Sequence, residues 1–146
     1  MDQKVDVCIV GAGPSGALLA YLLAKKNISV LLLEQTNQLA RSFRGEHINE
    51  EGEAILKKHH LFDKVANLGL LKMERLEYWL NGQLVKTITP NPSVGHLGIH
   101  VPQGHLLQAI IEAAQAYDTF EYCLNARVAE LLQDTSGRYN GVRAIC

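Results

Sequence analysis

The chain has 146 residues, of which 47% are hydrophobic and 20% are charged, and its formal net charge is −1. This length suits about one domain, and the composition argues against disorder, coiled coil and collagen. The balanced charge argues against a nucleic-acid partner, because no strong positive field is available to attract a polyanion. The three cysteines, Cys8, Cys123 and Cys146, form neither a disulfide framework nor a paired metal-ligand spacing, so we expect reducing cytosol.

An apolar run at 17–24 superficially resembles the core of a signal peptide. It is too short to span a bilayer, and Lys25-Lys26-Asn27 follows it where a small-residue cleavage site would be needed. We therefore expect a cytoplasmic protein without a membrane span.

The chain opens with the pattern of a βαβ unit. A nearly continuous β-branched run at 5–10 predicts a strand buried on both faces, as in a parallel sheet. A glycine-rich turn follows, then a helix predicted over 14–26 and a second buried strand over 29–33. Asn27 suits the left-handed position after the helix.

The later elements are more varied, and the elements do not close a doubly wound sheet. The chain also stops within a predicted strand, so we expect it to be the N-terminal part of a longer protein. The remaining predictions are a polar irregular segment at 35–49, helices at 50–58 and 61–67, a hairpin of strands 75–80 and 83–89 around Asn81-Gly82, a strand at 98–101, an amphipathic helix at 104–117, and strands at 120–122, 126–132 and 139–146.

The glycine turn Gly11-Ala12-Gly13-Pro14-Ser15-Gly16 fits a dinucleotide-binding motif, G-x-G-x-x-G between a strand and a helix. The first glycine allows a tight turn, the second lets a pyrophosphate approach the backbone, and the third lets helix and sheet pack closely. The unpaired N–H groups of the first helical turn, with the helix dipole, form an anion site. Glu34 ends the next strand 18 residues after Gly16, where a carboxylate binds an adenosine ribose. The alternative is that the glycines serve packing alone.

The residues beyond this unit bear on which dinucleotide is bound. An NAD-type domain should continue with further βαβ units, whereas this chain enters the arginine-containing segment 40–46, a helix and an antiparallel hairpin. The sequence here resembles the class A flavoprotein aromatic hydroxylases, the family of p-hydroxybenzoate hydroxylase and the ubiquinone-biosynthesis hydroxylases. The matching blocks are VDVCIVGAGPSGALLAYLLAKKNISVLLLEQ, FRGEHINEEGEAILKKHHLFDKV, and the stretch from Val101-Pro102-Gln103 to Ile110.

The resemblance implies an FAD-binding role for particular residues. Residues 11–16 would bind the FAD pyrophosphate and Glu34 the adenosine ribose, with Gln35 standing where the family often has an arginine. Arg44 resembles the family arginine that lies against the FAD phosphates, and Arg41 is a second candidate on the same loop. Gln103 resembles the family Arg or Gln near the ribityl and pyrophosphate groups, and Val128 resembles a strand residue whose backbone meets the adenine. The simpler alternatives are a surface ion pair for Arg44, a helix cap for Gln103 and packing for Val128.

The resemblance also implies an activity and a domain organisation. We expect a Rossmann-type α/β FAD-binding domain formed by 1–74 and 90–146, with 75–89 as a β-hairpin of an interleaved substrate domain. In this family NAD(P)H reduces the flavin, and O2 then supplies an oxygen atom to an aromatic or similarly electron-rich small molecule. A flavoprotein reductase or halogenase, a non-catalytic nucleotide-binding or redox-sensing module, and an NAD-dependent dehydrogenase remain alternatives. No residue stands out as a chemical catalyst, and His96, His100 and His105 lack the spacing of a metal site.

Overall fold

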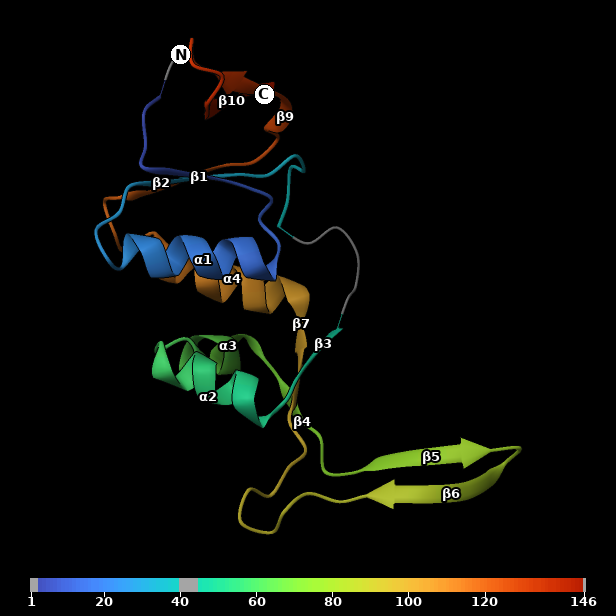
Figure 1. The fold of residues 1–146 in the computed structure, drawn as a ribbon. Helices are drawn as coiled ribbons and strands as arrows, with labels where there is room; N and C mark the ends of the chain where they lie inside the picture. Colours follow the sequence, from blue (N-terminus) through green and yellow to red (C-terminus); the bar gives the residue numbers. More distant parts are fainter. Residues whose placement is uncertain (1–2, 40–44, 146) are drawn as a thin grey trace. The chain divides into compact units, whose positions relative to one another are not determined.

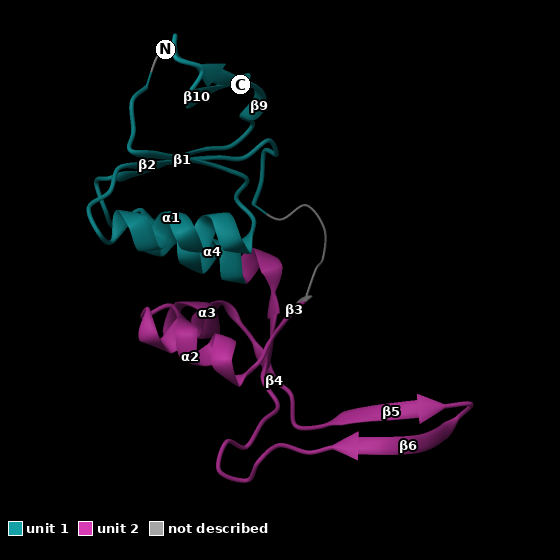
Figure 2. Ribbon diagram, viewed as in Figure 1, with its two compact units in different colours: residues 1–42, 106–146 teal, residues 43–105 magenta. Residues whose placement is uncertain are grey.

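The computed structural model describes residues 3–39 and 45–145, which form an α/β fold. They divide into two compact units, residues 1–42 with 106–146 and residues 43–105 (Figure 2). Each unit has two sheets of its own.

The first unit is organised around a parallel sheet in the order β1-β2-β8. The strands are β1 (Val7–Val10), β2 (Val30–Leu33) and β8 (Phe120–Cys123), and Val30 lies opposite both Val7 and Phe120. Helix α1 (Pro14–Ala24) connects β1 to β2. The predicted βαβ unit is thereby confirmed.

Small side chains let α1 pack closely against this sheet. Ala17, Ala20 and Ala24 are fully buried, and α1 contacts all three strands. Figure 1 shows α1 and helix α4 (Gln103–Ala114) on one side of the sheet, and the antiparallel pair β9 (Arg127–Gln133) and β10 (Tyr139–Ile145) on the other. The apolar face predicted for α4 is confirmed, since all its members are buried: Leu106, Leu107, Ile110, Ile111 and Ala114.

The second unit contains an antiparallel sheet in the order β3-β7-β4. Its strands are β3 (Gly45–Ile48), β7 (Ile99–Pro102) and β4 (Leu71–Lys72). Helices α2 (Glu50–Lys58) and α3 (Phe62–Leu68) complete its core, whose fully buried side chains are Leu61, Val65, Ile99 and Val101. The prediction of irregular structure through residue 49 was wrong at β3, because that strand forms by pairing with the distant β7.

The predicted hairpin is present as β5 (Leu76–Leu80) and β6 (Gln83–Ile88). Leu80 pairs with Gln83, so Asn81 and Gly82 form the two-residue turn, with φ values of 48° and 78°. Positive φ at both central residues is the requirement of a type I′ turn, which Asn-Gly meets at low steric cost.

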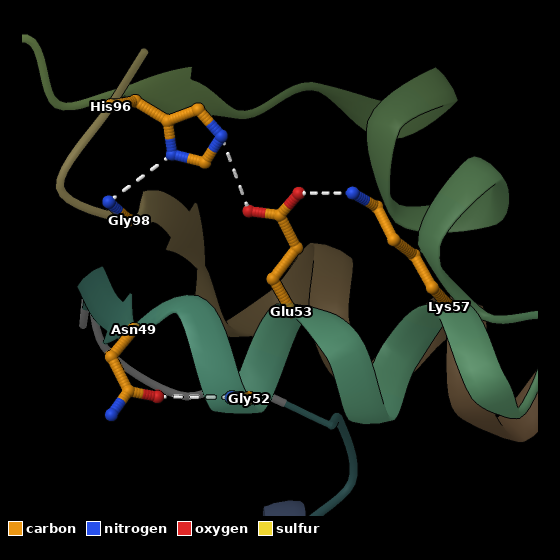
Figure 3. A network of polar contacts seen from close by, with 6 residues as sticks. All are labelled: Asn49, Gly52, Glu53, Lys57, His96 and Gly98. Carbon is orange, nitrogen blue, oxygen red and sulfur yellow. Dashed lines mark hydrogen bonds and ion pairs between the residues drawn. The ribbon is translucent and has the colours of Figure 1, made fainter. Parts of the chain in front are cut away.

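A polar network ties the loop before β7 to α2 within the second unit (Figure 3). The buried Glu53 carboxylate lies 2.6 Å from Lys57 Nζ and 3.5 Å from Nε2 of the nearly buried His96. The Gly98 N–H donates to His96 Nδ1 at 3.2 Å, so the ring proton is left for Nε2, facing Glu53. Asn49 caps α2 by accepting from the Gly52 N–H at 2.9 Å.

The remaining differences from the predicted boundaries are small. Helix α1 ends at Ala24 rather than at residue 26, and Asn27 takes the expected left-handed conformation with φ of 59°. Helix α4 ends at Ala114 rather than at residue 117. No helix in the described part of the chain has the length and apolar character that a bilayer crossing requires.

Candidate dinucleotide-binding site

The glycine turn leaves β1 beside the end of β2. The Gly11 N–H donates to the Leu33 carbonyl at 2.7 Å, which continues the strand pairing into the turn. Gly11 has φ of +103°, a conformation that L side chains rarely adopt, so the turn requires glycine here. The chain therefore passes from β1 through this tight turn directly into α1.

Gly16 is required by close packing. A Cβ built on Gly16 would lie 2.0 Å from the Gly11 carbonyl oxygen and 3.4 Å from a methyl carbon of Ile9. The first contact is with main chain, which has no flexible end that could move aside. This geometry agrees with the role predicted for the third glycine, which is to let the helix pack closely against the strand.

Gly13 lies on the open side of the same turn. It is exposed, and a Cβ built on it would meet nothing within 4 Å. It is the N-cap of α1, with Pro14 following, and no side chain caps the helix. The Ala17 N–H donates to the Gly13 carbonyl at 2.9 Å. Among the described hydrogen bonds, this is the first in α1 in which a helix N–H has a backbone acceptor. The preceding N–H groups of Ser15 and Gly16 are thus available to an anion.

The Glu34 carboxylate is anchored beside this turn by the backbone. Its Oε2 accepts from the Ala12 N–H at 2.9 Å, and its Oε1 accepts from the Thr36 N–H at 2.9 Å. A carboxylate oxygen has two acceptor sites, so each oxygen can still accept from a ribose hydroxyl. Because Ala12 lies inside the glycine turn, the anion site and the carboxylate form one structure.

Two opposing effects act on the pKa of Glu34. Partial burial raises it, but the hydrogen bonds that the carboxylate accepts, chiefly from the Ala12 and Thr36 backbone N–H groups, together outweigh burial. The pKa of Glu34 therefore lies below its ordinary value, and the group is ionised at neutral pH. An ionised carboxylate accepts hydrogen bonds from a diol and disfavours a phosphate in the same place.

The end of β2 is also tied to the start of β9. The Ala126 N–H donates to the Glu34 carbonyl at 2.8 Å, and the Asn125 N–H donates to the Thr36 carbonyl at 2.9 Å. These bonds hold Val128, two residues further along, on the strand that starts beside Glu34. The Val128 side chain is half-buried, and Gln35 is exposed next to Glu34.

The other residues predicted to contact the cofactor, Gln103, Arg41 and Arg44, lie outside this cluster or outside the described residues. Gln103 is the first residue of α4, in the second unit, and its Nε2 donates to Glu46 Oε1 at 2.7 Å. Arg41 and Arg44 lie outside the described residues. Within residues 3–39 and 45–145, no three His, Cys, Asp or Glu side chains are grouped to hold a metal ion.

Sequence reasoning missed Thr36 and Ala126 in this arrangement, and Glu46 as the partner of Gln103 in the second unit. Thr36 and Ala126 act through their main chain, so their side-chain type carries little signal. The Thr36 hydroxyl does donate to the Gln38 carbonyl at 2.7 Å, a local turn that a Thr after a strand end could have suggested. Glu46 has no local signal, since its partner is distant in the sequence.

The cluster fits the pyrophosphate and ribose of a dinucleotide such as FAD. The turn offers main-chain N–H groups, Gly13 leaves space for a close approach, and Glu34 supplies the sugar acceptor. Because Gly13 has no side chain, the space beside its backbone is open to a phosphate group.

Comparison with known proteins gives the same cofactor. The model of the FAD binding domain family matches residues 4–144. The chain is 29% identical over 143 residues to 6-methylpretetramide 4-monooxygenase of Streptomyces rimosus, covering 94% of this chain and 33% of that protein. It is 30% identical over 138 residues to the FAD-dependent monooxygenase ntnJ of a Nectria species, covering 89% of this chain and 30% of that protein.

A shorter match and a solved structure extend the comparison. The chain is 40% identical over 65 residues to digeranylgeranylglycerophospholipid reductase of Methanosarcina mazei, covering 44% of this chain and 15% of that protein. The structure of PqsL of Pseudomonas aeruginosa with 2-aminobenzoylacetate superposes with a TM-score of 0.83 at 23% identity, over 97% of this chain and 39% of that one. The chain thus spans well under half the length of each relative. On the match over residues 4–144, this chain belongs to the FAD-binding domain family of flavoprotein monooxygenases and related oxidoreductases.

Proposed function

We propose that this chain is the FAD-binding part of an NAD(P)H- and O2-dependent monooxygenase that acts on an aromatic or similarly electron-rich small molecule. The single observation that carries the cofactor assignment is the joined turn and carboxylate, with the Ala12 N–H bonded to Glu34 Oε2 at 2.9 Å. The monooxygenase assignment is supported by the matches over most of the chain, both to proteins named as monooxygenases.

Each residue of the site has a proposed task toward FAD. The N–H groups of Gly13, Ser15 and Gly16 bind the pyrophosphate, Gly11, Ala12 and Pro14 shape the turn, and Glu34 binds the adenosine ribose. On the strength of the family resemblance, Gln35 and the Val128 backbone are proposed contacts at the adenine end, and Gln103 is a proposed contact near the ribityl and pyrophosphate groups. Arg41 and Arg44 are proposed phosphate contacts on the strength of the family resemblance. When bound, FAD supplies the electron transfer and the oxygen chemistry, while the protein orients it and excludes water.

The domain division and the cellular location are further parts of this proposal. We assign 1–74 and 90–146 to the FAD-binding domain, and 75–89 to an interleaved substrate domain, although the compact units divide the chain elsewhere. In support, β5 and β6 form a separate sheet with several exposed large apolar side chains: Tyr78, Trp79, Leu80, Leu84 and Val85. A cytoplasmic location follows from the cysteine pattern.

Direct titration of the purified chain with FAD tests the cofactor assignment. We expect quenching of flavin fluorescence and a shifted visible flavin spectrum, with NADH competing only weakly. The matched control is Gly82→Ala, which changes a glycine in the hairpin turn and should leave FAD binding as in the wild type. Binding of NADH in preference to FAD would overturn the proposal.

A flavoprotein reductase is the second candidate, favoured by the 40% identity over 65 residues to the Methanosarcina mazei enzyme. The two candidates differ in their use of oxygen. A monooxygenase incorporates one atom of O2 into its product, whereas a reductase does not. Mass spectrometry of products formed under labelled O2, with the complete protein, separates them.

A further inference from the structure

We propose that His47 and His100 together bind one divalent transition-metal ion of the Zn²⁺ and Ni²⁺ class, through one imidazole nitrogen each. Both residues belong to the second unit, residues 43–105, so the site lies within one compact unit. The inference is independent of FAD, because the glycine turn and Glu34 belong to the first unit. It assigns a second kind of ligand to side chains that the proposed function does not use.

The fold places the two histidines directly opposite each other. Strands β3 and β7 pair antiparallel, with His47 opposite His100. Directly opposed residues of an antiparallel pair project from the same face of the sheet, with Cβ atoms about 4.5–5.5 Å apart. Two histidines from distant parts of the sequence therefore present their imidazoles side by side.

This face of the sheet is turned away from the core. Ile99 and Val101 alternate with His100 along β7 and are fully buried, whereas His47 and His100 are exposed. Among the described residues, neither imidazole has a hydrogen-bond partner, and each ring contacts the other. The ring nitrogens of both side chains are therefore free to bind a ligand from solvent.

The separation of the rings suits a single metal ion between them. Their centroids are 5.5 Å apart. A metal–nitrogen bond of about 2.0–2.1 Å puts each ring centroid about 3.2 Å from the metal, so two imidazoles on one ion have centroids about 4.5 to 6.4 Å apart. Rotation about the terminal torsion of each histidine, which is soft, then selects the nitrogen that faces the metal.

Gly98 makes room for this arrangement at the start of β7. A Cβ built on Gly98 would lie 2.8 Å from His47 Cε1 and 2.5 Å from the Ile48 carbonyl oxygen. Gly98 also has φ of +128°, a conformation that L side chains rarely adopt. The missing side chain leaves space for the His47 ring next to His100, and the neighbouring main chain limits where that ring can move.

The donor set selects the class of metal. Imidazole suits Zn²⁺, Ni²⁺ and Cu²⁺, whereas Mg²⁺ and Ca²⁺ prefer oxygen ligands. Within the described residues no third His, Cys, Asp or Glu joins the pair, so the other coordination positions are open to water. The spacing of His100 from His96 and His105 gave no metal site in the sequence, because the partner of His100 is brought to it by strand pairing.

Packing of the two rings on each other is the simpler alternative, and it predicts no saturable metal binding. Calorimetric titration of the untagged chain with NiCl₂ separates the two, since Ni²⁺ binds imidazole while thiols favour softer ions. We expect one Ni²⁺ per chain. His47→Thr and His100→Thr keep a residue that suits a strand and should each raise the Ni²⁺ dissociation constant more than about tenfold, because even supporting residues of metal sites contribute that much.

His60→Asn is the matched control. His60 is exposed after the end of α2 with φ of 59°, which asparagine tolerates, and it has no histidine paired across a sheet. This variant should bind Ni²⁺ as the wild type does. Ni²⁺ should also raise the melting temperature of the wild type and of His60→Asn but not of the two threonine variants, because the paired histidines meet only in the folded chain.

Circular dichroism without metal establishes that each variant is folded, and His47→Gln and His100→Gln replace a threonine variant that is not. Loss of affinity in both strand variants, with His60→Asn unchanged, supports the site. An equal loss in His60→Asn shows that Ni²⁺ binds surface histidines at large, and a loss in only one strand variant shows a single-histidine contact. Either result, or a wild-type chain without saturable binding, overturns the proposal.

Discussion

Gly13 and Gly16 lie three residues apart in the same turn, and the structure predicts opposite consequences for the same added methyl group. At Gly13 a Cβ meets nothing within 4 Å, whereas at Gly16 it lies 2.0 Å from the Gly11 carbonyl oxygen. Gly13→Ala should therefore impair cofactor binding without unfolding the protein. Gly16→Ala should destabilise the fold itself.

The magnitudes follow from the two positions. At Gly13, the entropic gain of about 0.4–1 kcal/mol from Gly→Ala opposes a comparable loss of N-cap preference, so the free energy of unfolding should change by less than about 1 kcal/mol. At Gly16, inside the first turn of α1, Ala gains up to about 1 kcal/mol in helix propensity. Overpacking costs typically about 1–3 kcal/mol, and here the contact is with main chain, so we expect net destabilisation of about 1–2 kcal/mol. For a chain of this size the melting temperature should fall by about 3–8 °C.

The assay pairs thermal unfolding without ligand with FAD titration. Gly13→Ala should melt close to the wild type and yet bind FAD at least about tenfold more weakly, because its methyl group occupies the space by which a pyrophosphate approaches the backbone. Gly82→Ala is a control for FAD binding alone, since alanine is strained at its φ of 78° and should destabilise the hairpin without touching the glycine turn. A Gly13→Ala variant with wild-type FAD affinity would refute the assignment of the pyrophosphate to this turn. A Gly16→Ala variant as stable as the wild type would refute the packing argument.

Two further predictions concern carboxylates. Because the pKa of Glu34 is lowered in the fold, its hydrogen bonds stabilise the protein above its ordinary pKa of 4.5, and this stabilisation is lost as the pH falls through the lower folded value. Urea unfolding should show Glu34→Gln less stable than the wild type at about pH 7, with the difference narrowing toward about pH 3; a constant difference would contradict the pKa argument. Glu53→Ala should lower the free energy of unfolding by about 1–3 kcal/mol, because it removes the buried carboxylate that lies 3.5 Å from Nε2 of the nearly buried His96 and leaves that polar ring nitrogen with an apolar neighbour, whereas Lys57→Ala removes a half-exposed ion pair worth under about 1 kcal/mol. Equal losses in these two variants would show that the histidine contact contributes nothing.

The comparison with known proteins identifies FAD as the cofactor of the family, whereas the reaction and the substrate have to be determined by experiment. The chain spans 33% of the length of the Streptomyces rimosus relative and 39% of PqsL. The substrate and the oxygen-dependent step are accordingly proposals. The residues that this chain contributes toward FAD can be tested on the chain itself, with binding as the readout.

Local patterns in the sequence were enough to predict the elements whose geometry depends on near neighbours. The G-x-G-x-x-G spacing between two apolar runs predicted the βαβ unit, and Asn81-Gly82 predicted a two-residue hairpin turn. The repeat of apolar residues in α4 predicted its buried face. In each case the controlling interactions lie within a few residues, or follow from a period that matches the helix or strand.

Tertiary structure alone decided the features that join distant residues. Strand β3 forms because residues 45–48 pair with β7, and its own sequence has no alternation of apolar and polar residues that would predict a strand. The bond from the Ala12 N–H to Glu34, the pairing of Glu46 with Gln103, and the approach of His96 to the buried Glu53 likewise need segments brought together by folding. Polar contacts of this kind depend on the distance and direction of two groups in space, which the order of residues along the chain does not specify until the sheets have formed.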